Sequence, residues 1–233
     1  MQEHGSGFSI PFSIAGLDLA ITLPVMIMWG VSLFIFLFLF IANHSHAVKR
    51  VQFFIFDFIS EAFAKSIHTK TKLWYSFLLT LFLFVFLNNL CGLLPGGESP
   101  TGNINVTAAL AVAVFLISQI SGFFVHGPTH VTHLIPSGIP KVMLVFFIPL
   151  ELISLLAKPF SLAVRLFANM MAGHKVLLIF MGLGIKSPAL IKLLPFGGVV
   201  LISLFEMFVS FIQAFIFTYL ASFYISDAVN GAH

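Results

Sequence analysis

The stretch LPVMIMWGVSLFIFLFLFIA, residues 23–42, is apolar over almost its whole length and contains no charged side chain. A transmembrane helix needs about 20 predominantly apolar residues to cross the hydrocarbon core of a bilayer. The whole 233-residue chain has this character, because 59% of its residues are hydrophobic and only 8% are charged. Soluble domains carry about 25% charged residues. The sequence therefore predicts an all-α integral membrane protein.

Four further stretches are long and apolar enough to cross a membrane, at about residues 73–94, 107–125, 142–182 and 196–225. The last two exceed the length of one perpendicular crossing, so we expect these helices to be tilted. The turn between them, around residues 186–192, predicts that they form an antiparallel hairpin. No internal repeat divides the chain, so we expect residues 1–233 to form one polytopic membrane domain.

The segment between the first two predicted spans has a different pattern. In residues 51–66, Asp57, Glu61 and Lys65 recur every four residues and form one polar stripe, while phenylalanines cover much of the remaining surface. This pattern predicts an amphipathic helix that lies in the membrane interface. A short soluble helix packed on the membrane domain is the alternative.

The basic residues predict the orientation of the chain in the membrane, because Lys and Arg concentrate in short cytoplasmic loops. Five basic residues lie between the first two predicted spans: Lys49, Arg50, Lys65, Lys70 and Lys72. Two others, Lys186 and Lys192, lie in the last loop, on the side predicted to be outside, and run against this rule. Five spans then place the N-terminus outside and the C-terminus in the cytoplasm, or in the matrix of an organelle.

Several functional classes are disfavoured. The net charge of +3 comes from few, scattered basic residues, so we expect no nucleic-acid partner. Motifs of the GxxxxGK[ST], HExxH and GxSxG types are missing from the sequence, and we expect neither a catalytic site nor a cofactor. Cys91 is the one cysteine. His126, His130 and His133 suggest a metal, but no Cys, Asp or Glu lies nearby in sequence, so a polar interfacial loop is favoured over a metal site.

The last two predicted spans contain six ionisable residues: Glu151, Lys158, Arg165, His174, Lys175 and Glu206. An ionisable group at the bilayer centre costs about 2.5 to 3.5 kcal/mol on insertion scales. Glu151, Lys158 and Arg165 follow at seven-residue intervals and Asn169 lies four residues further, so all four share one helix face. A network that joins helices could explain Glu151 and Lys158. Arg165 lies near mid-span and stays protonated, which favours a functional role.

The predicted hairpin brings polar residues to matching depths. Arg165 and Gln213 are equidistant from residue 189, and His174 and Glu206 are equidistant from residue 190. Histidine titrates near neutral pH, so His174 and Glu206 suit a proton path nearer the outer surface, with packing alone as the alternative for His174. His174 lies about 180° around an ideal helix from Arg165, so either Gly173 permits a bend or the two face different neighbours, and the second suits a channel beside the arginine.

Asn88 and Asn89 lie near the outer end of the second predicted span. They either line the same entrance or cap the helix.

The segments PLELISLLAKPFSLAVRLFANMMAGH (149–174) and FVSFIQAFIFTYLASFYI (208–225) resemble the last two helices of subunit a of the F-type rotary ATP synthase. NNLCGLLPG (88–96) resembles the outer end of an earlier helix of that family. The resemblance covers nearly the whole chain. It implies a stator that packs against a ring of c subunits, each with a mid-membrane carboxylate, between two offset proton half-channels.

The resemblance also implies roles for particular residues. Arg165 matches the essential arginine that faces the rotor, with Asn169 and Gln213 as its polar partners. His174 and Glu206 match outer half-channel positions, where some members carry Glu first and His second. The polar positions toward the inner side are Glu151 and Lys158, and Asn88 and Asn89 are assigned to the outer half-channel.

As further partners the resemblance implies b-type peripheral stalk subunits, the rest of the complex and the lipid bilayer. The expected location is the bacterial plasma membrane, with the mitochondrial inner membrane as the alternative. A sodium-coupled version of the same subunit is the alternative function. A secondary transporter would predict an internal repeat and broken helices around a central pocket, and the sequence indicates neither. A structural membrane protein without conduction would need no titratable series.

Overall fold

The computed structural model describes residues 9–14, 17–42, 44, 46–63, 72–94, 97, 99–127, 141–186 and 193–230. The elements in these residues are β1 (Ser9–Ile14), β2 (Leu17–Thr22), α1 (Leu23–Ala42), α2 (His46–Phe63), α3 (Lys72–Cys91), η1 (Pro100–Gly102), α4 (Ile104–His126), α6 (Lys141–Lys186) and α7 (Leu193–Asn230). By length and composition, α1, α3, α4, α6 and α7 can each cross a membrane. The prediction of an all-α membrane protein is therefore confirmed.

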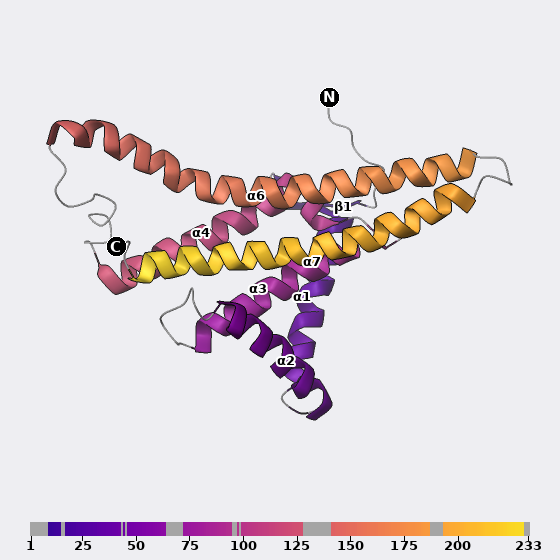
Figure 1. Cartoon of the computed structure of the whole chain (residues 1–233), viewed down its shortest axis with the longest axis horizontal. Helices are drawn as coiled ribbons and strands as arrows, with labels where there is room; N and C mark the ends of the chain where they lie inside the picture. The colour runs from indigo at the N-terminus through magenta and orange to yellow at the C-terminus, as the bar shows by residue number, and fades with distance from the viewer. Residues whose placement is uncertain are drawn as a thin grey trace.

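The two longest helices form the predicted antiparallel hairpin. α6 has 46 residues and α7 has 38, and they run side by side in opposite directions (Figure 1). α4 packs against both of them, and α3 packs against α7. α1 and α2 form a separate limb next to α3 (Figure 1). α6 bows away from α7 toward its N-terminal end, in the half that contains Pro149 and Pro159, because proline disrupts regular helix geometry.

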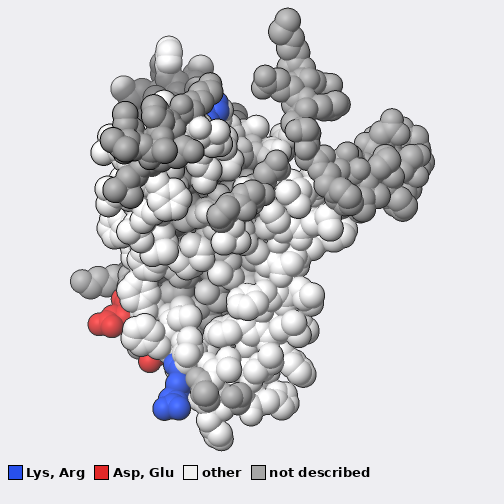
Figure 2. Space-filling model, turned by 90° about the vertical axis from the view of Figure 1, so that its right-hand side faces the viewer, with Lys and Arg blue, Asp and Glu red and all other residues white. Residues whose placement is uncertain are grey.

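The packed core lies where α3 meets α7. Leu78, Phe82 and Val85 follow at helical spacing on α3 and belong to one buried cluster with Phe217 and Ala221 of α7. Of the five spans α3 is the most enclosed within the chain and α6 is the most exposed. Charged side chains are sparse on the face seen in Figure 2, where most of the surface is uncharged. Most of the α6 surface is thus left uncovered by the other described helices.

The helix boundaries differ from the predicted ones in a few places. α1 has the predicted bounds, while α4, α6 and α7 each extend a few residues beyond them. α2 begins at His46, five residues earlier than predicted, because HAVKR consists mostly of residues that favour helix. Lys65, the last member of the predicted polar stripe, lies outside the described residues.

A β-hairpin precedes α1 and was not predicted from the sequence. β1 and β2 pair antiparallel from Ser9 with Thr22 to Ile14 with Leu17. Apolar residues alternate with other residues along both strands, and the register places Phe12 opposite Leu19. Alternation over four to eight residues is the sequence signal of a strand, so this pattern could have identified the hairpin.

The chain before α4 is inserted among the helices. η1 contacts α1, α3, α4 and α6, and its residues Pro100 and Thr101 are buried. α4 then begins at a defined cap, because the Asn103 side chain accepts a hydrogen bond from the backbone N–H of Asn105 at 2.9 Å. This arrangement fixes Thr101 beside the end of α3.

Glycines set the register of the α6–α7 hairpin. A Cβ on Gly173 would collide with the Glu206 carboxylate, and a Cβ on Gly198 would come within 2.7 Å of the Phe180 ring. The midpoints of both pairs fall at residues 189–190, which is the centre predicted from the polar residues. Helices that meet through glycine approach each other closely.

Replacement of Gly198 by Ala is expected to destabilise the hairpin. The added methyl would force the Phe180 ring to move, and overpacking of this kind costs about 1–3 kcal/mol. The measurement is the thermal unfolding midpoint of the purified protein in detergent. Gly197→Ala is the matched control, since a Cβ there meets nothing within 4 Å. Equal midpoints for the two variants would contradict the predicted close packing.

Candidate ion pathway

Arg165 lies near the middle of α6. Its side chain is exposed, whereas the neighbouring Leu162 and Leu166 are buried. Within the described ranges Arg165 makes neither an ion pair nor a hydrogen bond. A permanent cation in an apolar span is costly unless it has a partner. The described chain offers Arg165 no ion pair that would offset this cost.

A cavity of about 270 Å³ lies between α6 and α7. Asn169 and Gly173 line it from α6, and Ile202 and Glu206 line it from α7. Nδ2 of Asn169 and Oε1 of Glu206 are buried and have no hydrogen-bond partner among the residues that the structure describes. A water molecule needs polar partners, and in this mainly apolar cavity Asn169 and Glu206 are the polar side chains that could bind one.

His174 follows Gly173 on α6 and is half-buried. Its Nδ1 atom is buried, and the described neighbours offer it no hydrogen-bond partner. Gly173, rather than His174, lies directly against the Glu206 carboxylate. The two titratable side chains therefore occupy neighbouring levels of the hairpin without a direct hydrogen bond in the described structure. A proton would need an intervening water to pass between them.

Gln213 lies on the interior side of α7. It is buried, whereas Arg165 is exposed, and no hydrogen bond joins the two in the described part of the chain. Ser210, one helical turn before Gln213, is fully buried, and its Oγ has no partner among described residues. The hairpin thus carries buried polar groups along α7 as well as the exposed cation on α6.

Asn88 and Asn89 are fully buried at the end of α3 and contact the η1 segment. The Thr101 hydroxyl donates a hydrogen bond to Oδ1 of Asn89 at 2.6 Å, and the Ser99 and Thr101 hydroxyls lie 2.7 Å apart. Oδ1 of Asn88 and Nδ2 of Asn89 have no partner among the described residues. These residues form a second polar cluster with spare hydrogen-bonding capacity.

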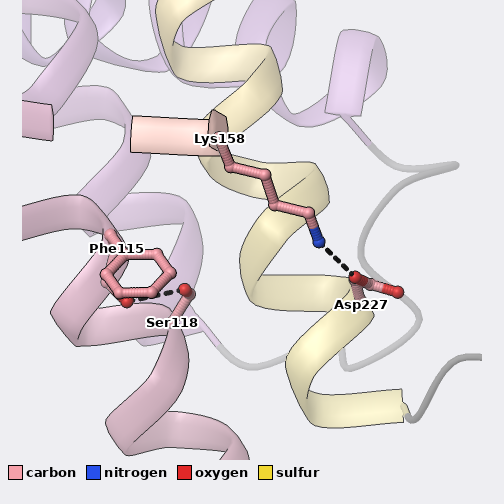
Figure 3. A network of polar contacts seen from close by, with 4 residues as sticks. All are labelled: Phe115, Ser118, Lys158 and Asp227. Atoms are coloured by element: carbon pink, nitrogen blue, oxygen red, sulfur yellow. Dashed lines mark hydrogen bonds and ion pairs between the residues drawn. The ribbon is translucent and has the colours of Figure 1, made fainter. Parts of the chain in front are cut away.

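Lys158 binds a carboxylate near the end of α7. Its Nζ lies 3.2 Å from Oδ2 of Asp227, and both side chains are about one-third exposed (Figure 3). The ammonium also lies 5.6 Å from the centre of the Tyr224 ring, within range of a cation–π contact. In the same view, Ser118 on α4 bonds to the carbonyl of Phe115 at 2.7 Å. Glu151, two turns before Lys158, is half-buried and makes no ion pair in the described ranges.

His126 joins two helix ends and is not part of a metal cluster among the described residues. Its Nε2–H donates a hydrogen bond to the carbonyl oxygen of Val229 at 2.8 Å, which ties the end of α4 to the end of α7. No group of three potential metal ligands occurs among the residues searched. His130 and His133 lie outside the described residues.

Sequence reasoning missed three residues that the structure brings next to the predicted ones. Asp227 lies two positions beyond the predicted end of the last span, but α7 continues to Asn230. Tyr224 carries no charge pattern that would indicate its contact with Lys158. Thr101 reaches Asn89 through the inserted η1 segment, a contact for which the sequence pattern holds no signal.

Comparisons with known proteins gave three relevant matches. A family model described as ATP synthase A chain matches residues 25–226. The ATP synthase subunit a of Rhodospirillum rubrum is 39% identical to this chain over 176 residues, which cover 76% of this chain and 73% of that protein. The ATP synthase subunit a of Magnetococcus marinus is 36% identical over 230 residues, which cover 95% and 89%.

Proposed function

The chain belongs to the ATP synthase A chain family, and on that premise we propose that it is the proton-conducting stator subunit of an F-type ATP synthase. Its partners are the ring of c subunits, b-type peripheral stalk subunits and the rest of the complex. It contributes no catalytic site and binds no cofactor. Two half-channels in and beside the chain carry protons to and from the ring carboxylates, and this flow turns the ring.

The observation that carries the proposal is the exposed Arg165 without a partner in the described chain. A carboxylate that arrives on the ring would supply the missing anion. Attraction to a fixed cation favours the ionised carboxylate and lowers its pKa, which promotes proton release. The same positive charge repels protons that would otherwise pass directly between the half-channels. Asn169, one turn further along α6, is the polar neighbour of this contact.

The cavity between α6 and α7 supports the proposed outer half-channel. Glu206 and Asn169 leave buried polar atoms unpartnered at this cavity, and His174 does so nearby. Asn88 and Asn89 supply further unpartnered atoms at the end of α3. Water bound at such atoms would connect titratable groups that do not touch each other.

The inner half-channel is proposed to begin at the other end of the hairpin, where Glu151 and Lys158 are the polar positions on α6. Gln213 lies between the two ends as a buried polar group on α7. The excess of basic residues between α1 and α3 favours an outside N-terminus and a cytoplasmic C-terminus. The proposed location is the bacterial plasma membrane, with α2 in the interface.

Two observations bear on the alternatives. A secondary transporter would use broken helices around a central pocket, whereas α6 and α7 are continuous over 46 and 38 residues. The proposed path also contains two titratable side chains, His174 and Glu206, which suit protons rather than sodium. Protons are therefore the favoured coupling ion.

The test is ATP synthesis by the complete complex in liposomes, driven by an imposed pH gradient and membrane potential. Complexes that contain this chain should synthesise ATP without sodium, and complexes assembled without it should not. Synthesis that depends on a sodium gradient would overturn the proton assignment. Equal synthesis with and without the chain would overturn the stator assignment.

Replacement of His174 by Ala, with Glu206 intact, is expected to slow proton entry by about tenfold. This is less than the 10²–10⁴-fold typical for loss of a positioned acid–base group, because Glu206 remains. The measurement is the rate of proton uptake as the outside pH varies at constant inside pH. A rate equal to wild type across that range would assign His174 to packing alone.

A further inference from the structure

Ser210 on α7 has a buried hydroxyl that has no role in the proposed half-channels. The side chain is fully buried, and its Oγ atom has no hydrogen-bond partner among the described residues. The other buried Ser and Thr hydroxyls of the described chain each make a hydrogen bond, and they belong to Thr101, Thr107, Ser118, Thr218 and Ser222. A buried hydroxyl without a partner costs free energy, which favours binding of a small polar ligand there.

The register between α4 and α7 gives Ser210 a polar neighbour. Both helices end at the same end of the molecule (Figure 1), where His126 bonds to Val229, 103 positions later in the chain. The same offset pairs three sets of buried residues: Thr107 with Ser210, Ala111 with Ala214, and Val114 with Phe217. The Thr107 hydroxyl donates to the carbonyl of Ile104 at 3.1 Å, and its oxygen keeps the capacity to accept. Ser210 therefore lies at the level of a second buried hydroxyl.

Ser210 also lies between Glu206 and Gln213 on one face of α7. The three residues fall within an arc of about 60° around the helix. From Glu206 to Gln213 the helix rises about 10.5 Å, which is too far for one water molecule, because a water joins two polar atoms about 5.6 Å apart. Ser210 divides this rise into steps of about 6 Å and about 4.5 Å. Its hydroxyl both donates and accepts, as a link between waters requires.

We propose that Ser210 binds a water molecule between Glu206 and Gln213, and that this water extends the outer proton path from the cavity toward the middle of α7. The inference rests on the proposed proton-conducting function. Each water in such a path accepts one proton and releases another, while the Ser210 hydroxyl holds its water in place. The oxygen of Thr107, at the same level of α4, is a second acceptor for that water.

Ser210→Ala in the complete complex tests this water site. ATP synthesis in liposomes at an imposed pH gradient and membrane potential should slow by roughly fivefold, the rate effect of about 1 kcal/mol, which is the net contribution of one neutral hydrogen bond. The thermal unfolding midpoint of the complex should stay at or above that of wild type, because the variant removes a buried polar group without a described protein partner.

Ser222→Ala is the matched control. Ser222 is equally buried on α7, but its hydroxyl donates to the carbonyl of Tyr219 at 2.7 Å. This variant should synthesise ATP at the wild-type rate. Wild-type synthesis by Ser210→Ala as well would overturn the proposal.

A second variant separates water binding from packing. Ser210→Gly also removes the hydroxyl, but it leaves space in which another water replaces it. Glycine lowers helix stability, so this variant should unfold at a lower temperature than Ser210→Ala and yet synthesise ATP faster. A role in packing alone gives the opposite order, in which the least stable variant is the slowest, and that result would also reject the water site.

Arg165→Ala in the same assay distinguishes this inference from the function on which it depends. Wild-type synthesis by Arg165→Ala would remove the proposed function and, with it, the reason for a water at Ser210. Background synthesis by Arg165→Ala, together with wild-type synthesis by Ser210→Ala, would leave the function standing and reject the water site alone.

Discussion

Replacement of Arg165 by Ala is expected to reduce proton-driven ATP synthesis to background. The exposed guanidinium is the charge that the described chain leaves unneutralised at mid-helix, so its loss removes the proposed attraction for the ring carboxylate. Arg165→Lys should restore only a small part of the activity. Lysine lacks the planar fork of arginine, and it can lose its proton in an apolar environment.

Passive proton flux gives this prediction a second readout. Removal of Arg165 leaves the other half-channel residues in place and removes the charge that separates them, so proton leakage through the membrane sector should not fall along with synthesis. Lys175→Ala is the matched control, because Lys175 is an exposed basic residue on the same helix. Substantial synthesis by Arg165→Ala in liposomes would refute the assignment of this arginine to the rotor contact.

Replacement of Gly173 by Ala should lower the rate of proton-driven ATP synthesis by about tenfold or more. The added methyl would displace the Glu206 carboxylate, and a positioned acid–base group typically contributes about 10²–10⁴-fold to a rate. A Cβ at this position collides with the Glu206 carboxylate, and Gly173 also lines the cavity. Either the carboxylate rotates away or the two helices separate. Both changes disrupt the proposed water-connected path.

A compensating change distinguishes this local collision from general damage. Glu206→Asp shortens the side chain and withdraws the carboxylate, so Gly173→Ala/Glu206→Asp should conduct better than Gly173→Ala alone. Gly182→Ala is the control, because a Cβ there meets nothing within 4 Å. If Gly173→Ala conducts protons as well as Gly182→Ala, the close contact between Gly173 and Glu206 is not needed for conduction. Proton uptake into vesicles measures all four variants.

The membrane spans could be predicted from the sequence because hydrophobic length is a local property. α1 occupies its predicted bounds, and the antiparallel α6–α7 hairpin has its predicted centre. The centre could be predicted because polar residues in an apolar helix are costly and tend to lie at matching depths on neighbouring helices, even where they form no direct bond. One turn position accounted for two polar pairs, and contacts at Gly173 and Gly198 agree with it.

The parts that escaped prediction depend on contacts between distant segments or on weaker patterns. The β1–β2 hairpin has alternating residues, but the hydropathy of the adjacent span dominates that region. The bond from Thr101 to Asn89 requires the chain before α4 to enter the helix bundle, and hydropathy does not indicate such an insertion. Asp227 was missed because charged residues at a helix end are usually read as solvated.

The predicted functional residues likewise include some features that a local pattern indicates and others that depend on contacts between distant segments. Helical spacing predicted that Arg165 and His174 could face different neighbours, and in the structure Arg165 is exposed while His174 is half-buried. Spacing could not indicate that Gly173 meets Glu206, or that Gln213 faces inward while Arg165 faces outward. Those outcomes depend on how α4 and α3 pack around the hairpin, which one helix alone does not determine.

The exposed surface of α6 has a consequence for friction in the motor. In the half of the helix before Arg165, α6 exposes large apolar side chains on its other faces, among them Leu152, Ile153, Leu156 and Phe160. Dispersion contacts between such groups are individually weak and have no preferred direction, unlike hydrogen bonds. In the proposed motor, a ring that slides over apolar side chains of α6 would meet shallow energy minima, whereas its contact with Arg165 would be released and recaptured at each step.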